Sequence, residues 1–181
     1  MSRSLTPLRR LTAGALMIAG AGISGLGIAS ADPGDYTGLL VHPNDVTDST
    51  AYSSGPPILD PNGQPGAQAV YTHRDGTRAI TDTVLVLADP VAATDAMNAA
   101  RANSGIANPK SQPAPVGIDG TLLAGTGENG QSVSVLLFTQ GNTATTVEFD
   151  GPGNDPAPED LVIQFGQQQD NTIKGWQASM G

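Results

Sequence analysis

The 181-residue chain has no cysteine, few aromatic residues (three Phe, three Tyr and one Trp) and only eight basic residues. The absence of cysteine excludes a disulfide framework, a cysteine-ligated zinc or iron–sulfur site and a cysteine nucleophile. Seventeen acidic residues give a formal net charge of −9. This balance argues against nucleic acid as a partner, because phosphate recognition needs a basic surface.

The first 31 residues have the pattern of a secretory signal. Arg3 and the Arg9-Arg10 pair precede an apolar stretch over residues 11–29, and Ala29-Ser30-Ala31 matches the A-x-A cleavage pattern. We expect cleavage after Ala31, by the general route or, given the paired arginines, the twin-arginine route. The mature protein would then be secreted or held in the cell envelope. It would not be an integral membrane protein, although an uncleaved anchor is the alternative.

Beyond residue 31, the chain divides into a loose segment and a domain. Residues 32–66 hold six Pro and five Gly with no sustained period, which predicts an irregular arm that is partly disordered. Residues 67–181 are long enough for a single α+β domain, which we expect to be monomeric. The strong acidity favours solubility and disfavours binding to anionic membrane surfaces.

The domain shows an ordered series of strand and helix signals. Asp89-Pro90 suits a helix start, because Asp can cap and Pro fits the first helical position. The expected strands are 67–73, 77–88, 120–125, 131–140 and 143–150, and the expected helices run from Pro90 to about Asn103 and onward from Pro158. The order β-β-α-β-β-β-α predicts an antiparallel sheet of about five strands packed by two helices.

The last helix carries the most informative apolar pattern. A stripe with 3–4–4–3 spacing is typical of a helix face packed on a core, and it comprises Val162, Phe165, Gln169, Ile173 and Trp176. The alternative is that the helix leaves a gap over the sheet that holds an apolar ligand. The candidate binding residues for that gap are Leu136, Phe138, Phe165 and Trp176.

The sequence motifs that commonly indicate a catalytic or ligand-binding site are incomplete here or lie in the wrong structural context. The stretch Gly125–Gly130 matches G-x-G-x-x-G but lies between two expected strands, so it predicts a hairpin turn. The start of a calcium loop at Asp60 fails because Pro65 occupies the position that needs glycine. We therefore predict no catalytic residues, no metal and no cofactor.

The only histidines are His42 and His73, and both have the setting of surface residues. A serine-type hydrolase would have to use one of them, because neither G-x-S-x-G nor S-x-x-K occurs after residue 31. The enzyme alternative is a small hydrolase that uses His73 with Asp75 or Asp82.

Two stretches resemble exported actinobacterial proteins. Thr83–Ala96 is similar to the strand and Ala-rich helix of the extracellular sensor-type domains of mycobacterial serine/threonine kinases. Val147–Lys174 resembles the end of LpqN-type proteins, which implies an α/β sandwich of the Mog1/PsbP kind. The resemblance transfers no catalytic residue. The chain also lacks the lipid-accepting cysteine of the lipoproteins and the paired cysteines of the kinase domains.

Together these features predict a non-enzymatic protein that binds a protein or an envelope lipid outside the cell. A structural or antigenic surface protein without a ligand is the remaining alternative.

Overall fold

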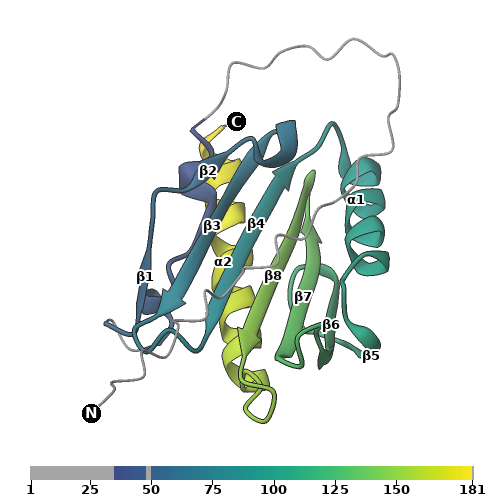
Figure 1. The fold of residues 1–181 in the computed structure, drawn as a ribbon. Coiled ribbons are helices and arrows are strands. Elements are labelled where there is room, and N and C mark those ends of the chain that lie inside the picture. The colour runs from purple at the N-terminus through teal and green to yellow at the C-terminus, as the bar shows by residue number, and fades with distance from the viewer. Residues whose placement is uncertain (1–34, 48–49, 181) are drawn as a thin grey trace, which may run out of the picture.

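Residues 35–47 and 50–180 are described by a computed structural model, which is an α+β fold (Figure 1). The expected signal sequence lies outside these residues. The helices are α1 (Pro90–Ala102) and α2 (Glu159–Ser179), with short 3-10 turns η1 (Tyr36–Leu39), η2 (Pro43–Asp45) and η3 (Pro61–Gly63). The strands are β1 (Tyr52–Ser54), β2 (Ile58–Leu59), β3 (Gly66–His73), β4 (Ala79–Val86), β5 (Ala107–Pro113), β6 (Ile118–Thr126), β7 (Ser132–Gln140) and β8 (Thr143–Gly151).

All eight strands belong to one antiparallel sheet in the order β1-β3-β4-β8-β7-β6-β5, with β2 also paired to β3. The expected fold class and the two helices are confirmed, but the sheet has eight strands where about five were predicted. The additional strands are β1, β2 and β5. None of the three shows the apolar alternation that predicts a strand, because β1 and β2 are very short and all seven residues of β5 are exposed.

The two helices begin where local chemistry favours them. The Asp89 carboxylate accepts from the Ala92 N–H at 2.8 Å, and Pro90 is the first residue of α1. Glu159 and Asp160 lie in the first turn of α2, where negative charge interacts favourably with the positive end of the helix dipole. The apolar stripe of α2 is buried from Val162 to Ile173.

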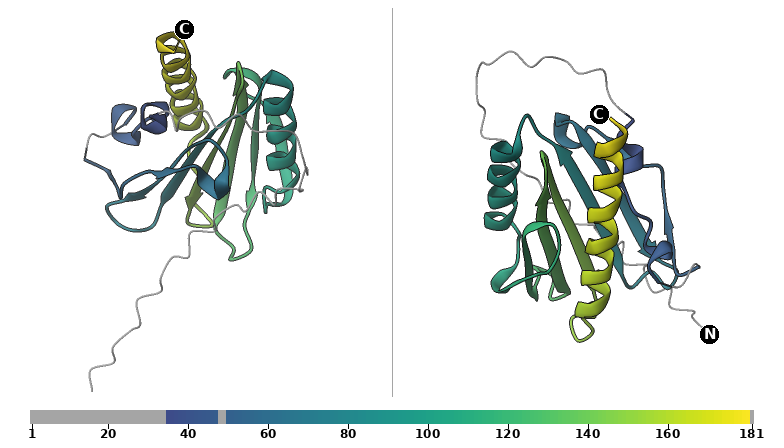
Figure 2. Two further views of the ribbon diagram at one scale, coloured as in Figure 1. Left: turned by 90° about the horizontal axis from the view of Figure 1, so that it is seen from above. Right: turned by 180° about the vertical axis from the view of Figure 1, so that it is seen from behind.

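The sheet separates two apolar clusters, one on each face (Figure 2). We call these the α2 face and the α1 face, after the helix that packs on each. Alternate residues of each strand point to opposite faces. The α2 face includes Ile80, Leu136 and Val147, whereas the α1 face includes Val133 and Val135.

The α2 face is closed by chain segments from both ends of the described region. Segment 35–47 lies beside α2 and places the fully buried Leu39 and the nearly buried Val41 into the core. Gln169 of α2 holds this segment by its side chain, which accepts from the Val41 N–H at 3.0 Å and donates to the Leu39 carbonyl. Both backbone groups are thereby satisfied inside the core.

The α1 face is covered only in part. α1 packs on β7 and β8, where Met97 and Ala100 meet Val135 and Leu137. β3 and β4 lie beyond the reach of α1, and no helix of the described residues covers their near face in Figure 1. This uncovered half of the α1 face is the setting of the candidate site.

Candidate binding surface on the sheet

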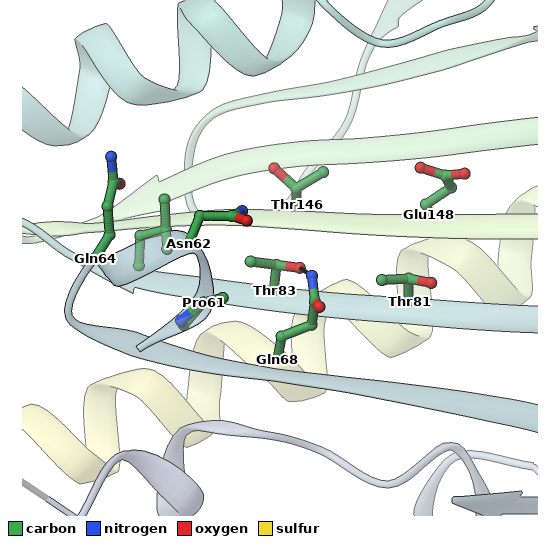
Figure 3. Close-up of a pocket in the computed structure, with 9 residues that line it drawn as sticks. Pro61, Asn62, Gln64, Gln68, Thr81, Thr83, Thr146 and Glu148 are labelled. Carbon is green, nitrogen blue, oxygen red and sulfur yellow. Dashed lines mark hydrogen bonds between the residues drawn. The ribbon is translucent and has the colours of Figure 1, made fainter. Parts of the chain in front are cut away.

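Polar side chains from three adjacent strands form one surface on the uncovered half of the α1 face. In the pairing register Gln68 of β3 lies opposite Thr83 of β4, and Thr83 lies opposite Thr146 of β8. Glu148 lies opposite Thr81 in the neighbouring row. We call these five residues the polar sheet surface; Figure 3 shows them standing on the side of the sheet away from α2.

A turn closes one end of this surface and turns it into a shallow pocket. Pro61, Asn62 and Gln64 of the η3 region line the pocket together with the polar sheet surface and Leu85 (Figure 3). The volume enclosed is about 30 Å³, so the pocket holds a small group and opens onto a wider surface.

The η3 turn adopts backbone conformations that are uncommon for residues with side chains. Asp60 has φ 50° and Asn62 has φ 56°, both in the left-handed region. Asp and Asn tolerate this region better than most residues, but it still costs conformational energy. The contacts around the turn must outweigh this cost, and strained turns of this kind concentrate at binding sites.

Hydrogen bonding leaves much of the surface available. The Gln68 side-chain amide donates to the Thr83 hydroxyl at 2.8 Å, which fixes the two side chains relative to each other. Thr81, Thr83 and Thr146 are half-buried. Each hydroxyl can donate one hydrogen bond and accept two, so the surface presents matched donors and acceptors at fixed spacing.

Glu148 is the only ionisable group that lines the pocket. It is 9% exposed, and burial, reinforced by the negative charge of Asp150 two residues away, raises its pKa to about 7. Burial also raises the pKa of Asp150. At neutral pH Glu148 is therefore divided between its ionised and protonated forms, and the protonated form adds a donor to the surface.

The four residues predicted to line an apolar gap have different positions. Leu136 and Phe138 are completely buried and Phe165 is 1% exposed, and all three belong to the core of the α2 face. Phe165 packs edge-on against Phe149 with ring centroids 5.7 Å apart. The predicted apolar ligand site at these residues stays a prediction.

Trp176 lies outside that tightly packed core. Its ring is 6.0 Å from that of Tyr36, and it lines a surface pocket of about 420 Å³ with Val86, Gly141, Asn142, Gln177 and Met180. Met180 is 66% exposed. The structure thus separates Trp176 from the other three predicted residues by their exposure.

The residues of the hydrolase hypothesis are brought together only in part. Nδ1 of His73 lies 2.8 Å from the Asp75 carboxylate at the turn after β3, and backbone and side-chain hydrogen bonds from Thr77 and His73 lower the pKa of Asp75. Asp82 lies in the middle of β4, opposite Ala69, on the α2 face. His73 is also at the edge of the ring of Tyr52.

Asp82 is the most unusual buried group among the described residues. Its side chain is completely buried and neither carboxyl oxygen has a hydrogen-bond partner. Burial raises its pKa well above the ordinary value, and the nearby Val41 N–H offsets only part of this effect. Burial therefore favours the protonated form of Asp82, which belongs to the packing between β4 and segment 35–47.

The polar sheet surface was not predicted from the sequence. Thr81 and Thr83 alternate with Ile80 and Val84, a pattern that is typical of any strand with one solvated face. The feature that distinguishes the surface is the overhanging η3 turn, which depends on a fold-dependent contact between distant segments. The local sequence signal is the run Asp60-Pro61-Asn62-Gly63, whose residue types favour turns.

No protein-family model matches the chain, and no curated protein matches its sequence. Among solved structures, the extracellular domain of PknH from Mycobacterium tuberculosis has a similar fold. The TM-score is 0.58 at 12% sequence identity, over 80% of this chain and 97% of that chain. The chain therefore shares the fold of an extracellular domain, which agrees with one of the two resemblances noted in the sequence. The LpqN-type resemblance has no support in these comparisons.

Two other kinds of feature bear on the candidate sites: a helix that could cross a membrane, and a cluster of side chains that could bind a metal ion. Within residues 35–47 and 50–180, none of the helices combines the length and apolar character needed to cross a bilayer. The same residues contain no group of three or more His, Asp or Glu side chains placed to hold a metal ion. The described region thus offers surfaces and pockets, but no metal centre, as candidate sites.

Proposed function

We propose that this protein is a secreted or envelope-associated, non-enzymatic binding domain whose recognition surface is the polar sheet surface. The observation that carries the proposal is the uncovered half of the α1 face, where five polar side chains from three strands lie beneath a strained turn. The fold shared with an extracellular domain supports the location outside the cell.

The side chains indicate the chemistry of the ligand. Six neutral polar side chains line the pocket as donors and acceptors, Pro61 and Leu85 complete the lining beside Glu148, and no cation lies among them. Glu148 is partly protonated at neutral pH, so the surface has little charge to attract an ion. We therefore propose a neutral ligand rich in hydroxyl groups, such as a carbohydrate, held by hydrogen bonds with Thr81, Thr83 and Gln68.

The proposal is tested by following backbone amide signals of the purified chain by NMR during titration with glucose, galactose, arabinose and N-acetylglucosamine. Binding is expected to shift the signals of Gln68, Thr83 and Thr146 in a saturable way. Thr83→Val removes the hydroxyl but keeps the shape, and should weaken binding about tenfold. Thr126→Val, an exposed threonine at the end of β6, is the matched control. The absence of saturable shifts with all four sugars would overturn the carbohydrate assignment.

The hydrolase alternative requires His73 to act on a substrate. In our proposal the His73 and Asp75 pair fixes the turn after β3, which Thr77 also braces by donating to Asp75 at 2.8 Å. His73→Ala should then lower stability without abolishing any turnover. A loss of hydrolysis of p-nitrophenyl acetate in a folded His73→Ala variant, relative to His42→Ala, would favour the enzyme.

The surface pocket at Trp176 favours a second candidate partner. Its apolar ring and the exposed Met180 flank about 420 Å³ of open space, which suits an apolar group of a protein or of an envelope lipid. Binding of uncharged phosphatidylcholine vesicles that is lost in Trp176→Ala and retained in Thr83→Val would assign recognition to this pocket instead.

A further inference from the structure

A second groove lies on the other side of α1 from the polar sheet surface. It runs between α1 and the strands β5 and β6, and its volume is about 460 Å³, within the usual range for small-molecule sites. Its walls are mainly polar. The lining residues that matter below are Asn98, Arg101, Ser111, Gln112, Asp119 and Thr121.

Arg101 is the only cation that lines this groove, and it has no acidic partner among the described residues. Its Nη2 donates to the Thr121 hydroxyl at 2.8 Å, which fixes the guanidinium across the groove. Its Nε is buried and has no hydrogen-bond partner. Because Nε is enclosed by protein, a ligand in the groove would reach the guanidinium through its Nη groups. The lack of an ion pair is notable in a chain with 17 acidic residues.

The wall opposite Arg101 is built from an irregular segment of β6. The pairing of β6 with β7 shifts between Ile118 and Thr121, so the strand bulges there. Asp119 has φ 55°, and a Cβ on Gly120 would lie 2.3 Å from the Val116 carbonyl oxygen. The bulge therefore depends on glycine at position 120, and bulges of this kind re-aim side chains next to functional sites.

The bulge places a negative charge on the same groove as Arg101. The Thr121 hydroxyl that accepts from Arg101 also donates to the Asp119 carbonyl oxygen at 3.0 Å, so the two residues are linked through one hydroxyl. Their charged groups nevertheless form no ion pair. The groove thus presents one cation and one anion that are held apart by the fold.

We infer that this groove binds a small amino-carboxylate, an amino acid or short peptide, with its carboxylate on Arg101 and its ammonium group near Asp119. A carboxylate balances the charge of Arg101, which has no acidic partner among the described residues, and accepts hydrogen bonds from the Nη groups of the guanidinium. The acidity of the chain and the nearby Asp119 disfavour phosphates and dicarboxylates. Asn98, Ser111 and Gln112 are available to a peptide's remaining polar groups.

The inference is tested by NMR titration of the purified full chain with L-alanine, L-lysine and L-alanyl-L-alanine, to concentrations on the order of 10 mM, where weak binding is still measurable. The amide signals of Asn98, Arg101 and Thr121 should shift in a saturable way. The methyl ester of the dipeptide lacks the carboxylate and should bind at least about tenfold more weakly. The N-acetyl dipeptide lacks the ammonium group and should bind about threefold more weakly.

Variants of the chain separate the charge from the fold. Arg101→Gln should abolish saturable binding, and Arg101→Lys, which keeps the charge but loses the planar fork, should weaken it. Asp119→Asn should remove the preference for the free dipeptide over its N-acetyl form. Lys110→Gln removes an equal charge from exposed β5 outside the groove and is the matched control.

Three results would overturn the inference. The first is no saturable shift at the groove with any of the three ligands. The second is equal binding of the dipeptide and its methyl ester, a comparison that needs no variant to fold. The third is unchanged binding by a folded Arg101→Gln protein. Shifts confined to Gln68, Thr83 and Thr146 would place the ligand on the polar sheet surface, so this inference and the proposed function fail separately.

Discussion

The two faces of the sheet are made by the same strands but are covered to different extents. On the α2 face, α2 and segment 35–47 close over the strands, and the residues of β4 that point there, such as Val84 and Asp82, are completely buried. On the α1 face the neighbouring Thr81 and Thr83 remain half-exposed. Alternation along one strand therefore places core packing on one face and the proposed recognition surface on the other.

The comparison also concerns how each face accommodates polar groups. The α2 face buries Asp82 and Gln169 inside an apolar cluster, where Gln169 is satisfied by backbone and Asp82 is not. The uncovered half of the α1 face gathers its polar groups where water or a ligand can reach them. Changes on the α2 face should therefore act mainly on folding, and changes on the α1 face mainly on binding.

The largest effect is expected from Phe165→Ala, which removes an aromatic ring from the centre of the α2 face. Phe165 is 1% exposed and packs against Phe149, so truncation leaves a cavity that the surroundings fill only in part. We expect a loss of about 3–5 kcal/mol in the free energy of unfolding. Urea unfolding measures it, with Thr83→Val expected to change the same quantity by less than about 0.5 kcal/mol. Similar losses in the two variants would contradict the division between faces.

The next effect concerns the attachment of segment 35–47. Gln169→Ala deprives the Val41 N–H and the Leu39 carbonyl of their partner inside the core. Leaving such groups unsatisfied should cost about 2–3 kcal/mol. Hydrogen exchange of the Val41 amide should accelerate more than exchange in β7. Gln167→Ala, on the exposed side of α2, is the control, and equal acceleration in both variants would show that Gln169 does not hold the segment.

Asp82→Asn should stabilise the protein at neutral pH by about 2 kcal/mol, because the amide keeps the shape of the protonated acid but does not have to hold a proton to stay buried. Burial raises the pKa of Asp82 in the folded state, so the unfolded chain releases this proton near pH 4 while the folded chain keeps it. The wild-type contribution to stability therefore falls as the pH rises above about 4. Urea unfolding at several pH values should show the two proteins converging in acid. A difference that is constant with pH would contradict this account.

The extent to which the sequence predicts this molecule follows the range of the interactions. Local signals located α1 from Asp89-Pro90 and the buried stripe of α2 from its spacing. They also located two central strands, because β7 is long and largely apolar and β8 follows it directly after the Gly141-Asn142 turn. The strand β5 has no such signal: Lys110 and Ser111 join the sheet through backbone pairing with β6 alone.

The candidate sites were less predictable for the same reason. The polar sheet surface needs the η3 turn to lie over β4, and the Arg101 groove needs a bulge in β6 to meet α1. Neither contact is encoded in the spacing of nearby residues. The spacing of the last helix predicted a core-facing stripe that includes Phe165, with an apolar ligand gap as the alternative, and Phe138 and Phe165 are both buried in the core.

The smallest expected effect on stability comes from Glu148→Gln, and it sharpens the comparison with Asp82. Both carboxyls have a pKa raised by burial, but Glu148 lines an open pocket and its pKa is raised only to about 7. The wild-type contribution to stability should fall as the pH rises from about 4.5 to about 7 and then level off, because above pH 7 both states are ionised. Glu148→Gln should remove this dependence and raise the free energy of unfolding at pH 7.

If Glu148 faces a ligand as proposed, sugar binding should also weaken between pH 6 and 8 in the wild type, since only the protonated acid donates a hydrogen bond. Binding to the Glu148→Gln variant should stay constant over the same range. A pH-dependent stability with pH-independent binding would leave Glu148 a packing residue like Asp82, and the recognition surface would shrink to its threonines and Gln68.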